Sequence, residues 1–238
     1  MKKIFAVLSL CFVLSPLVNA QMIIYPVTTW ELIFNPSNVE SNLGEGTENI
    51  NSNMRFTGFF NWGQNIHFDV NNKFGFYTGL AFRNIGIIID DQRYNDMNTV
   101  EYSKVKRRSY TLGLPVALKV GNFDRNIYLF AGGEIEMLFH YKEKYWVNGV
   151  KYKSKEWFKN KTERWNPSVF VGIQFPGGVS IKYKYYFNDF LNHDYKDSMY
   201  DFTSLKETSY WYVSIGWQFR TRRVEKVMKK NYTNMALR

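Results

Sequence analysis

The segment Tyr210-Trp211-Tyr212-Val213-Ser214-Ile215-Gly216-Trp217-Gln218-Phe219 decides the fold that this sequence predicts. Large apolar side chains alternate along it with small or polar ones. Because successive side chains of a β-strand point to opposite faces, the segment predicts a strand with one apolar face and one polar face. This alternation is typical of a membrane-spanning barrel, whose strands turn an apolar face to lipid and a polar face to the interior.

Seven further segments alternate in the same way. They are Thr28–Asn35, Phe56–Val70, Lys73 to about Ile87, about Lys106–Val120, a segment beginning near Asn126, about Arg164–Phe175 and Val179–Asn188. About ten residues at a rise of roughly 3.3 Å, tilted in the sheet, span the ~25 Å apolar band of an outer-membrane barrel. The sequence therefore predicts an all-β fold, an eight-stranded antiparallel up-and-down transmembrane barrel.

The connections alternate in length, as the two sides of such a barrel require. The short turns are Asn71-Asn72, Gly121–Arg125 and Pro176–Gly178, and the long connections include 37–53, 90–104, a hairpin with its turn at Asn148-Gly149, and 189–207. Short turns are typical of the periplasmic side and long loops of the outside. Pro115 cannot donate to a ladder and predicts a local break or bulge.

The N-terminus has the three regions of a secretory signal peptide. Lys2 and Lys3 precede an apolar run, Ile4–Leu14, and small residues stand at Val18-Asn19-Ala20. The expected division is a signal peptide over residues 1–20, a barrel domain over 21–219 and a basic periplasmic tail over 220–238. After residue 20 the sequence has no run of about 18 apolar residues that would span a bilayer as a helix.

The composition fits the same class of protein. The chain contains 20 Phe and 17 Tyr, yet its mean hydropathy is only −0.37. Aromatic girdles and interleaved polar residues explain this combination. Cys11 is the only cysteine and falls in the leader, so the mature chain has no disulfide and no thiolate metal site.

Three segments carry a resemblance to a known family. They are Tyr110-Thr111-Leu112-Gly113-Leu114-Pro115, Ala131-Gly132-Gly133 and the end of the last strand, Val213–Phe219. With the leader, they make the chain resemble the small outer-membrane protein beta-barrel domain family, which is similar in architecture to OmpA- and OmpX-type barrels. The resemblance implies that Phe219 serves as the terminal aromatic signal read by the barrel-insertion machinery.

The predicted inward faces carry charges of both signs. The candidates for an interior polar network are Glu31, Asp69, Arg83, Lys119, Glu134, Glu136, Lys182 and Lys184, and His67 and His140 are also expected to face inward. An eight-stranded barrel is just wide enough for side chains to fill. Salt bridges that plug the barrel are the simpler interpretation, because isolated buried charges are costly. The alternative is a proton or substrate site at Glu134 and Glu136.

Catalytic and cofactor motifs are weak in this sequence. The histidines are scattered, without the spacing of a metal site, and no glycine-rich phosphate loop appears, so neither a metal nor a cofactor is expected. His193-Asp194 with Ser198 lies in a predicted outer loop. A barrel hydrolase could use such groups, but no nucleophile with a base and an orienting partner is evident.

Two outer loops have opposite charge. The third is basic and aromatic, with Lys142, Lys144, Trp146, Lys151, Lys153, Lys155, Trp157, Phe158, Lys159 and Lys161, and the fourth carries Asp189, Asp194, Asp197, Asp201 and Glu207. In an exported barrel, lipopolysaccharide phosphates or another surface ligand are better partners for the basic loop than nucleic acid. Alternatively, the two loops lie against each other.

We therefore expect an integral protein of a Gram-negative-type cell outer membrane. Its expected role is structural or in surface interactions, without enzymatic activity, and its expected partners are membrane lipid, the insertion machinery and a surface ligand or protein. An open pore is disfavoured by the strand number. Two alternatives stay open: a barrel enzyme acting on lipid or protein at the outer rim, and a soluble lipocalin-like barrel that holds an apolar ligand.

Overall fold

The computed structural model describes residues 22–43, 46–90 and 104–220. The predicted signal peptide and nearly all of the predicted tail lie outside these residues and stay predictions, as does most of the predicted loop 90–104. Within the described residues, no helix is long and apolar enough to cross a membrane.

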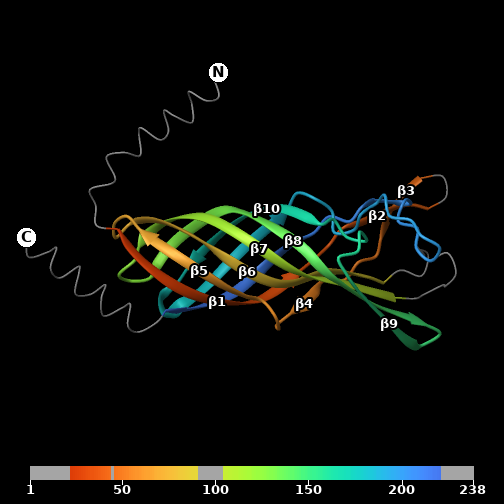
Figure 1. Cartoon of the computed structure of the whole chain (residues 1–238), viewed down its shortest axis with the longest axis horizontal. Coiled ribbons are helices and arrows are strands. Elements are labelled where there is room, and N and C mark those ends of the chain that lie inside the picture. Colours follow the sequence, from red (N-terminus) through yellow and green to blue (C-terminus); the bar gives the residue numbers. More distant parts are fainter. Residues whose placement is uncertain (1–21, 44–45, 91–103, 221–238) are drawn as a thin grey trace, which may run out of the picture.

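Eight antiparallel strands of the described chain close into a barrel (Figure 1). The ring consists of β1 (Ile23–Asn35), β5 (Trp62–Asp69), β6 (Phe74–Ile89), β7 (Lys104–Asn122), β8 (Ile127–Val147), β10 (Trp165–Gln174), β11 (Val179–Tyr186) and β13 (Trp211–Arg220). Each strand pairs with the ring neighbour that follows it in the chain, and the pairing of β1 with β13 closes the ring. The predicted eight-stranded up-and-down barrel is confirmed.

The short strand β4 (Arg55–Thr57) also pairs with β1 within the ring, and the remaining strands lie beyond one end of the ring. They are β9 (Val150–Trp157), which extends the sheet beside β8, and a small sheet of β12 (Leu205–Glu207), β2 (Val39–Leu43) and β3 (Gly46–Ile50). Figure 1 places β2, β3 and β9 at this loop end, whereas β1 begins and β13 ends at the opposite end, together with the short turns. One of these turns is a 3-10 turn, η2 (Pro176–Gly178).

The outer wall of the barrel is apolar. Large hydrophobic side chains stand exposed on the outward faces, among them Leu114, Val116, Leu118 and Leu129, and the inward faces of the same strands hold polar, charged and aromatic groups. Phe219, the predicted insertion signal, is exposed on β13. Because the apolar faces point outward, the lipocalin-like alternative, in which they line a ligand cavity, is wrong.

The second predicted strand, Phe56–Val70, is interrupted. β4 and β5 both pair with β1, but Thr57 lies opposite Ile33 and Trp62 opposite Trp30, so the intervening residues form a short bulged segment. We call residues 58–61 the knuckle. Phe60 in the knuckle has a left-handed backbone (φ 62°), which is uncommon for an aromatic residue.

Two irregularities mark the sheet of β6, β7 and β8. Near Pro115, the register of β7 against β6 is the same on both sides of a gap in the pairing, so the proline interrupts the ladder without shifting it. The register shift occurs instead between β7 and β8, where Tyr110 lies opposite His140 and Thr111 opposite Leu138. Phe139 is therefore an extra residue in β8, a β-bulge.

The Phe139 bulge reverses which residues of β8 face inward. Below it Glu134, Glu136 and Leu138 are buried in the barrel, and above it Tyr141 and Glu143 are buried instead. His140 is shifted onto the outward side, where its ring stacks on that of Tyr110. The prediction that His140 faces the interior is wrong, because a pattern of period two does not survive a one-residue insertion.

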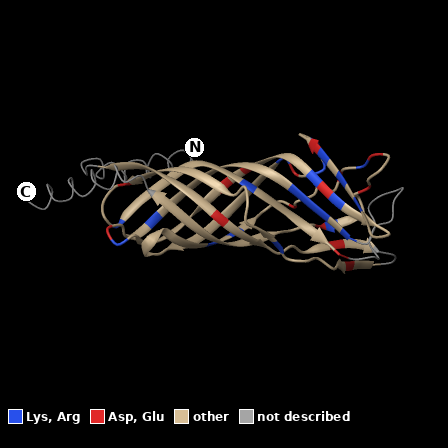
Figure 2. Ribbon diagram, turned by 90° about the horizontal axis from the view of Figure 1, so that it is seen from below, with Lys and Arg blue, Asp and Glu red and all other residues tan. Residues whose placement is uncertain are grey.

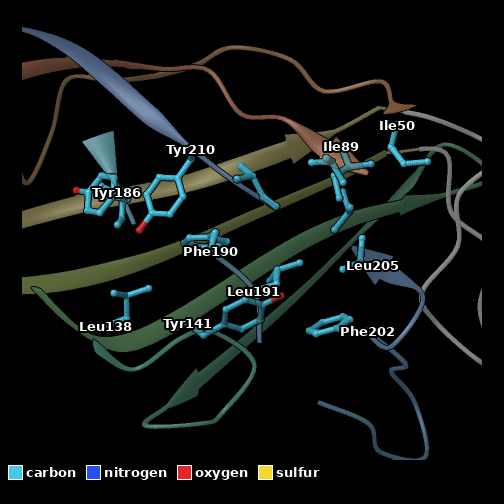
Figure 3. Packing of buried hydrophobic residues seen from close by; sticks show 14 of the residues in the cluster. Ile50, Ile89, Leu138, Tyr141, Tyr186, Phe190, Leu191, Phe202, Leu205 and Tyr210 are labelled. Atoms are coloured by element: carbon cyan, nitrogen blue, oxygen red, sulfur yellow. The ribbon is translucent and has the colours of Figure 1, made fainter. Parts of the chain in front are cut away.

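A hydrophobic core fills the loop end of the barrel (Figure 3). It combines inward residues of the long strands, such as Ile85 and Ile87, with loop residues such as Phe190 and Phe202. We call this cluster the outer core. Its presence means that the described parts of the long loops are packed as in a soluble domain over the mouth of the barrel.

Candidate functional site

All eight predicted interior residues lie inside the barrel and are at most 9% exposed. The structure brings six of them together in one charge cluster: Glu31, Arg83, Glu134, Glu136, Lys182 and Lys184. The other two, Asp69 and Lys119, form a separate ion pair. The larger cluster holds three acids and three bases, so its formal charges balance.

Arg83 on β6 is the hub of the charge cluster. Its guanidinium donates to Glu134, lies 3.2 Å from the Glu136 carboxylate and lies 3.5 Å from that of Glu31. A guanidinium presents several donors in a fixed plane, which suits contacts with several carboxylates. Removing one partner from a buried ion pair typically costs roughly 3–5 kcal/mol, so these contacts depend on one another.

The two lysines of β11 complete the cluster from the opposite wall. The Lys182 Nζ donates to Glu31 at 2.7 Å, and the Lys184 Nζ donates to Glu134 at 2.6 Å and also to Glu136. The Tyr186 hydroxyl donates to Glu136 at 2.9 Å. Gly113 on β7 makes room for this arrangement, because a Cβ at that position would collide with the Glu134 carboxylate.

The Asp69–Lys119 pair is surrounded by aromatic rings. The Tyr25 hydroxyl donates to Asp69 at 3.0 Å and accepts from the Lys119 Nζ at 2.9 Å. The lysine Nζ also lies 3.1 Å from the His67 Nδ1 and 4.3 Å from the centroid of the Phe123 ring. These hydrogen bonds and cation–π contacts compensate the desolvation of both charges.

The interior leaves little free space. A cavity of about 40 Å³ between Glu31, Tyr77, Arg83 and Lys182 accommodates only a few water molecules. No cluster of three or more potential metal ligands occurs among the residues that the structure describes. The charge balance of the cluster and the small volume of this cavity, which Glu134 lines, favour a structural plug over a substrate site.

The predicted rim residues do not form a base with an orienting partner. The His193 Nε2 contacts both the Asp189 Oδ2, at 3.3 Å, and the Thr208 Oγ1, at 3.2 Å. A catalytic histidine uses one nitrogen toward the nucleophile and the other toward its orienting group. The Thr208 hydroxyl is buried and accepts a hydrogen bond from the Leu191 backbone, so its position is that of a loop support.

A buried ion pair holds the fourth loop to the barrel. The Arg107 Nε donates to Glu143 at 2.8 Å, and the Tyr141 and Tyr200 hydroxyls each donate to the same carboxylate at 2.7 Å. Burial alone raises the pKa of the Glu143 carboxyl, but Arg107 and these donors outweigh it and lower that pKa. Burial and the nearby Glu143 raise the pKa of the Tyr200 phenol.

The basic third loop and the acidic fourth loop do contact each other. Thr162 and Leu191 form a β-bridge, and the Lys161 Nζ lies 3.6 Å from the centroid of the Tyr200 ring. Acidic residues of the fourth loop find basic partners within that loop, as in the Lys196–Asp201 ion pair. The contact therefore uses backbone and aromatic groups, and the lysines of β8 and β9 remain on a separate surface.

That surface, which we call the basic face, is the outward side of β7, β8 and β9 above the bulge. Cross-strand neighbours place on it Lys106, Arg108, Lys142, Lys144, Lys151, Lys153 and Lys155. Figure 2 shows these strands banded with Lys and Arg at the loop end. Sequence reasoning identified the lysines of the third loop but missed Lys106 and Arg108, whose alternation with Val105 and Arg107 was the available signal.

The aromatic row directly below the basic face is also built by pairing across these strands. Tyr110 lies opposite His140, and His140 lies opposite Trp157. The Tyr110 ring stacks on His140 and meets the edge of Phe60 at 5.7 Å between centroids. Aromatic rings gather where an apolar wall meets water in membrane barrels. The row therefore marks the upper boundary of the apolar wall.

The closed ring, the apolar outer wall and the filled polar interior define the class: a small transmembrane β-barrel of the outer-membrane type. No protein-family model matches the sequence, and no curated protein matches it either. Among solved structures, the chain is similar to the attachment invasion locus protein Ail of Yersinia pestis, with 12% identity, coverage of 82% of this chain and 99% of that chain, and a TM-score of 0.35.

Two other solved structures are similar to a comparable extent. Neisserial surface protein A is 9% identical over 83% of this chain and 97% of its own, with a TM-score of 0.35. The N-terminal barrel domain of Pseudomonas aeruginosa OprF is 8% identical over 84% of this chain and 100% of its own, with a TM-score of 0.33. At these values the assignment of the fold rests on the ring of strands itself.

Proposed function

We propose that this protein is an integral outer-membrane barrel that acts by surface binding, and that its basic face binds phosphate groups of lipopolysaccharide. The apolar wall and the filled interior support residence in a membrane without transport through the barrel. Phe219 on β13 is the proposed signal for the barrel-insertion machinery.

The observation that carries the proposal is the register of the cations. Lys106 lies opposite Lys144, which lies opposite Lys153, and the row below is Arg108, Lys142 and Lys155. Like charges directly opposite one another destabilise a sheet. Burial, Arg108 and neighbouring lysines lower the pKa values of Lys142 and Lys144, which is the electrostatic signature of this crowding. A bound polyanion would relieve the repulsion.

A non-enzymatic role is favoured over the rim enzyme. His193 contacts Asp189 and Thr208 through a single nitrogen, and Asp194 donates its backbone N–H to the Asn192 side chain within its own turn. Neither arrangement activates a nucleophile. The structural support of the fourth loop explains both residues without catalysis.

The proposal is tested by retention of the detergent-purified protein on immobilised lipopolysaccharide. The triple variant Lys151→Gln/Lys153→Gln/Lys155→Gln removes the β9 part of the basic face. Since one basic residue near an anionic surface contributes about 1 kcal/mol, affinity is expected to fall on the order of tenfold to a hundredfold. Binding of the unaltered protein is expected to weaken in high salt, because screening shortens the range of exposed charges.

A matched control removes the same charge from other exposed positions. Lys159→Gln/Lys196→Gln/Lys206→Gln alters lysines outside the basic face and is expected to bind as the unaltered protein does. Equal losses in both triple variants would reduce the effect to net charge and refute the basic face. Undiminished binding to lipopolysaccharide whose phosphates have been removed would refute it as well.

A further inference from the structure

A pocket lies at the lower edge of the basic face, where β4 approaches β7 and β8. Its volume is about 150 Å³, and all six residues that line it are basic: Arg55, Lys106, Arg107, Arg108, Lys142 and Lys144. This volume is comparable with that of a protein cavity that accommodates a benzene molecule. The pocket is therefore large enough for a compact anionic group such as a phosphate.

The arginines of the pocket are held in place. The Arg55 Nη1 donates to the Asn84 backbone oxygen at 2.9 Å, and its Nη2 donates to the Asn84 Oδ1 at 2.7 Å. The Arg108 guanidinium lies 5.3 Å from the centroid of the Tyr110 ring. Preorganised guanidinium groups suit phosphate, because their planar donors match its oxygens and little side-chain entropy is lost on binding.

The pocket opens beside the aromatic row. Phe60 and Tyr110 lie edge to face, and Trp157 packs on His140 with 4.3 Å between ring centroids. Phe60 and Phe158 both have left-handed backbones and both rings are exposed. Because such a backbone is strained for a bulky residue, the two exposed rings are held at this boundary by the surrounding structure at an energetic cost.

We infer that this pocket is a binding site for the phosphate of a single phosphorylated glycolipid of the outer leaflet, the lipid part of lipopolysaccharide. The phosphate lies among Arg55, Arg108 and Lys142, and the acyl chains run down the aromatic and apolar wall below. The inference rests on the proposed binding of lipopolysaccharide by the basic face, and it adds a stoichiometric site with a defined head-group position.

The test counts the lipids that stay on the folded full-length protein when it is released from detergent micelles in a native mass spectrometer. The probes are lipid A with its phosphates, the same lipid after their removal, and inorganic phosphate. The unaltered protein is expected to retain one phosphorylated lipid and to lose at least tenfold in occupancy with the dephosphorylated lipid. Arg55→Gln/Arg108→Gln is expected to show the same loss.

Two further variants separate this site from the rest of the basic face. Lys151→Gln/Lys153→Gln/Lys155→Gln is expected to keep the single lipid, because none of these lysines lines the pocket. Phe60→Ser leaves the basic residues in place and is expected to reduce lipid occupancy without affecting inorganic phosphate. A change of electrophoretic mobility on heating verifies that each variant is folded.

The outcomes distinguish the two proposals. Retention of the lipid by Arg55→Gln/Arg108→Gln would overturn the pocket, even if the β9 variant lost its binding to lipopolysaccharide. Displacement of the lipid by an equal concentration of inorganic phosphate would reduce the pocket to a site for the anion alone and would overturn the lipid assignment. Loss of lipid in the β9 variant would likewise overturn the pocket as a separate site.

Discussion

At the scale of single residues, Glu143 has an unusual position. Its carboxylate is buried in the outer core, yet it accepts hydrogen bonds from Arg107, Tyr141 and Tyr200, which come from β7, β8 and the fourth loop. Tyr200 is the only one of these donors that the loop supplies. The attachment of the loop to the barrel wall is therefore sensitive to the charge of one carboxyl group.

This dependence predicts that acid loosens the fourth loop. The folded-state pKa of Glu143 is lowered from the ordinary value of 4.5, so its contribution to stability is complete above pH 4.5 and is lost as the pH falls through the lowered value. The hydrogen-exchange protection factors of residues 189–208, which correct for the pH dependence of the intrinsic exchange rate, are expected to fall below pH 4. Glu143→Gln is expected to remove this pH dependence and, because it removes one charge of the buried ion pair with Arg107, to cost about 3–5 kcal/mol at neutral pH.

The control is Glu163→Gln, because Glu163 is a partly exposed carboxyl outside the outer core. It is expected to leave the acid transition of the fourth loop in place. An acid transition that persists unchanged in Glu143→Gln would show that another group controls the loop.

At the scale of elements, the Phe139 bulge coincides with a change of surroundings. Below it the outward face of β8 is the apolar wall, and above it the outward face belongs to the basic face. Odd-numbered apolar residues, including Ile135, Tyr141 and Tyr145, continue through the bulge without a break in the pattern. The bulge turns them from the outside to the inside of the barrel where lipid gives way to water.

Deletion of Phe139 alone is therefore expected to remove the bulge and to leave the residues of β8 above it on their present faces, because Tyr110 stays opposite His140 and Thr111 opposite Leu138. Deletion of both Phe139 and His140 would instead turn Glu143 outward and Lys142 and Lys144 into the outer core, where unpaired charges are costly. In this double deletion, limited proteolysis is expected to cleave 141–160 rapidly while the barrel keeps its heat-dependent mobility. Phe139→Leu and the single deletion of Phe139 are both expected to resist proteolysis; equal resistance of the double deletion would contradict the role of the bulge.

The sequence predicts the strands and misses the bulge for the same physical reason. Alternation reports which residues are apolar but not whether the apolar side faces lipid or a core. In β6 most large apolar residues occupy even-numbered positions up to Phe82 and odd-numbered positions from Ile85 onward. The strand has no bulge at this point, so the even-numbered residues that face lipid give way to odd-numbered residues that face the outer core. In β8 most apolar residues stay at odd-numbered positions along the whole strand. The extra residue Phe139 reverses the face to which these positions point, so the sequence pattern itself shows no change. The knuckle and the pocket depend on which residues of neighbouring strands lie opposite each other. The alternation within one strand does not predict this register.

At the scale of the whole molecule, the side chains of the described residues fill the barrel in three layers. Aromatic residues such as Tyr128 and Phe130 pack near the Asp69–Lys119 pair, the charge cluster fills the middle, and the outer core seals the loop end. The cavity beside Arg83, with a volume of about 40 Å³, is too small to serve as a channel of molecular width. Eight strands give a barrel that side chains can fill, and here they do.

This filling predicts that the protein does not conduct. In a planar lipid bilayer, its insertion is expected to add no steady current above background, whereas an open porin in the same membrane gives discrete steps. The number of inserted molecules is counted by fluorescence of a labelled Ser198→Cys variant, because Ser198 is exposed. Reproducible current steps that scale with the number of molecules would refute the plug.

The Glu31–Lys182 contact has a consequence for how the barrel assembles. The two residues are 151 positions apart in the chain, and they meet across the seam where β13 joins β1. An intermediate that has inserted most strands but has not closed this seam holds both charges without each other, facing hydrocarbon or trapped water. Closure of the seam and the pairing of Glu31 with Lys182 are thus one step, so the final strand pairing of the barrel and the completion of its interior charge cluster coincide.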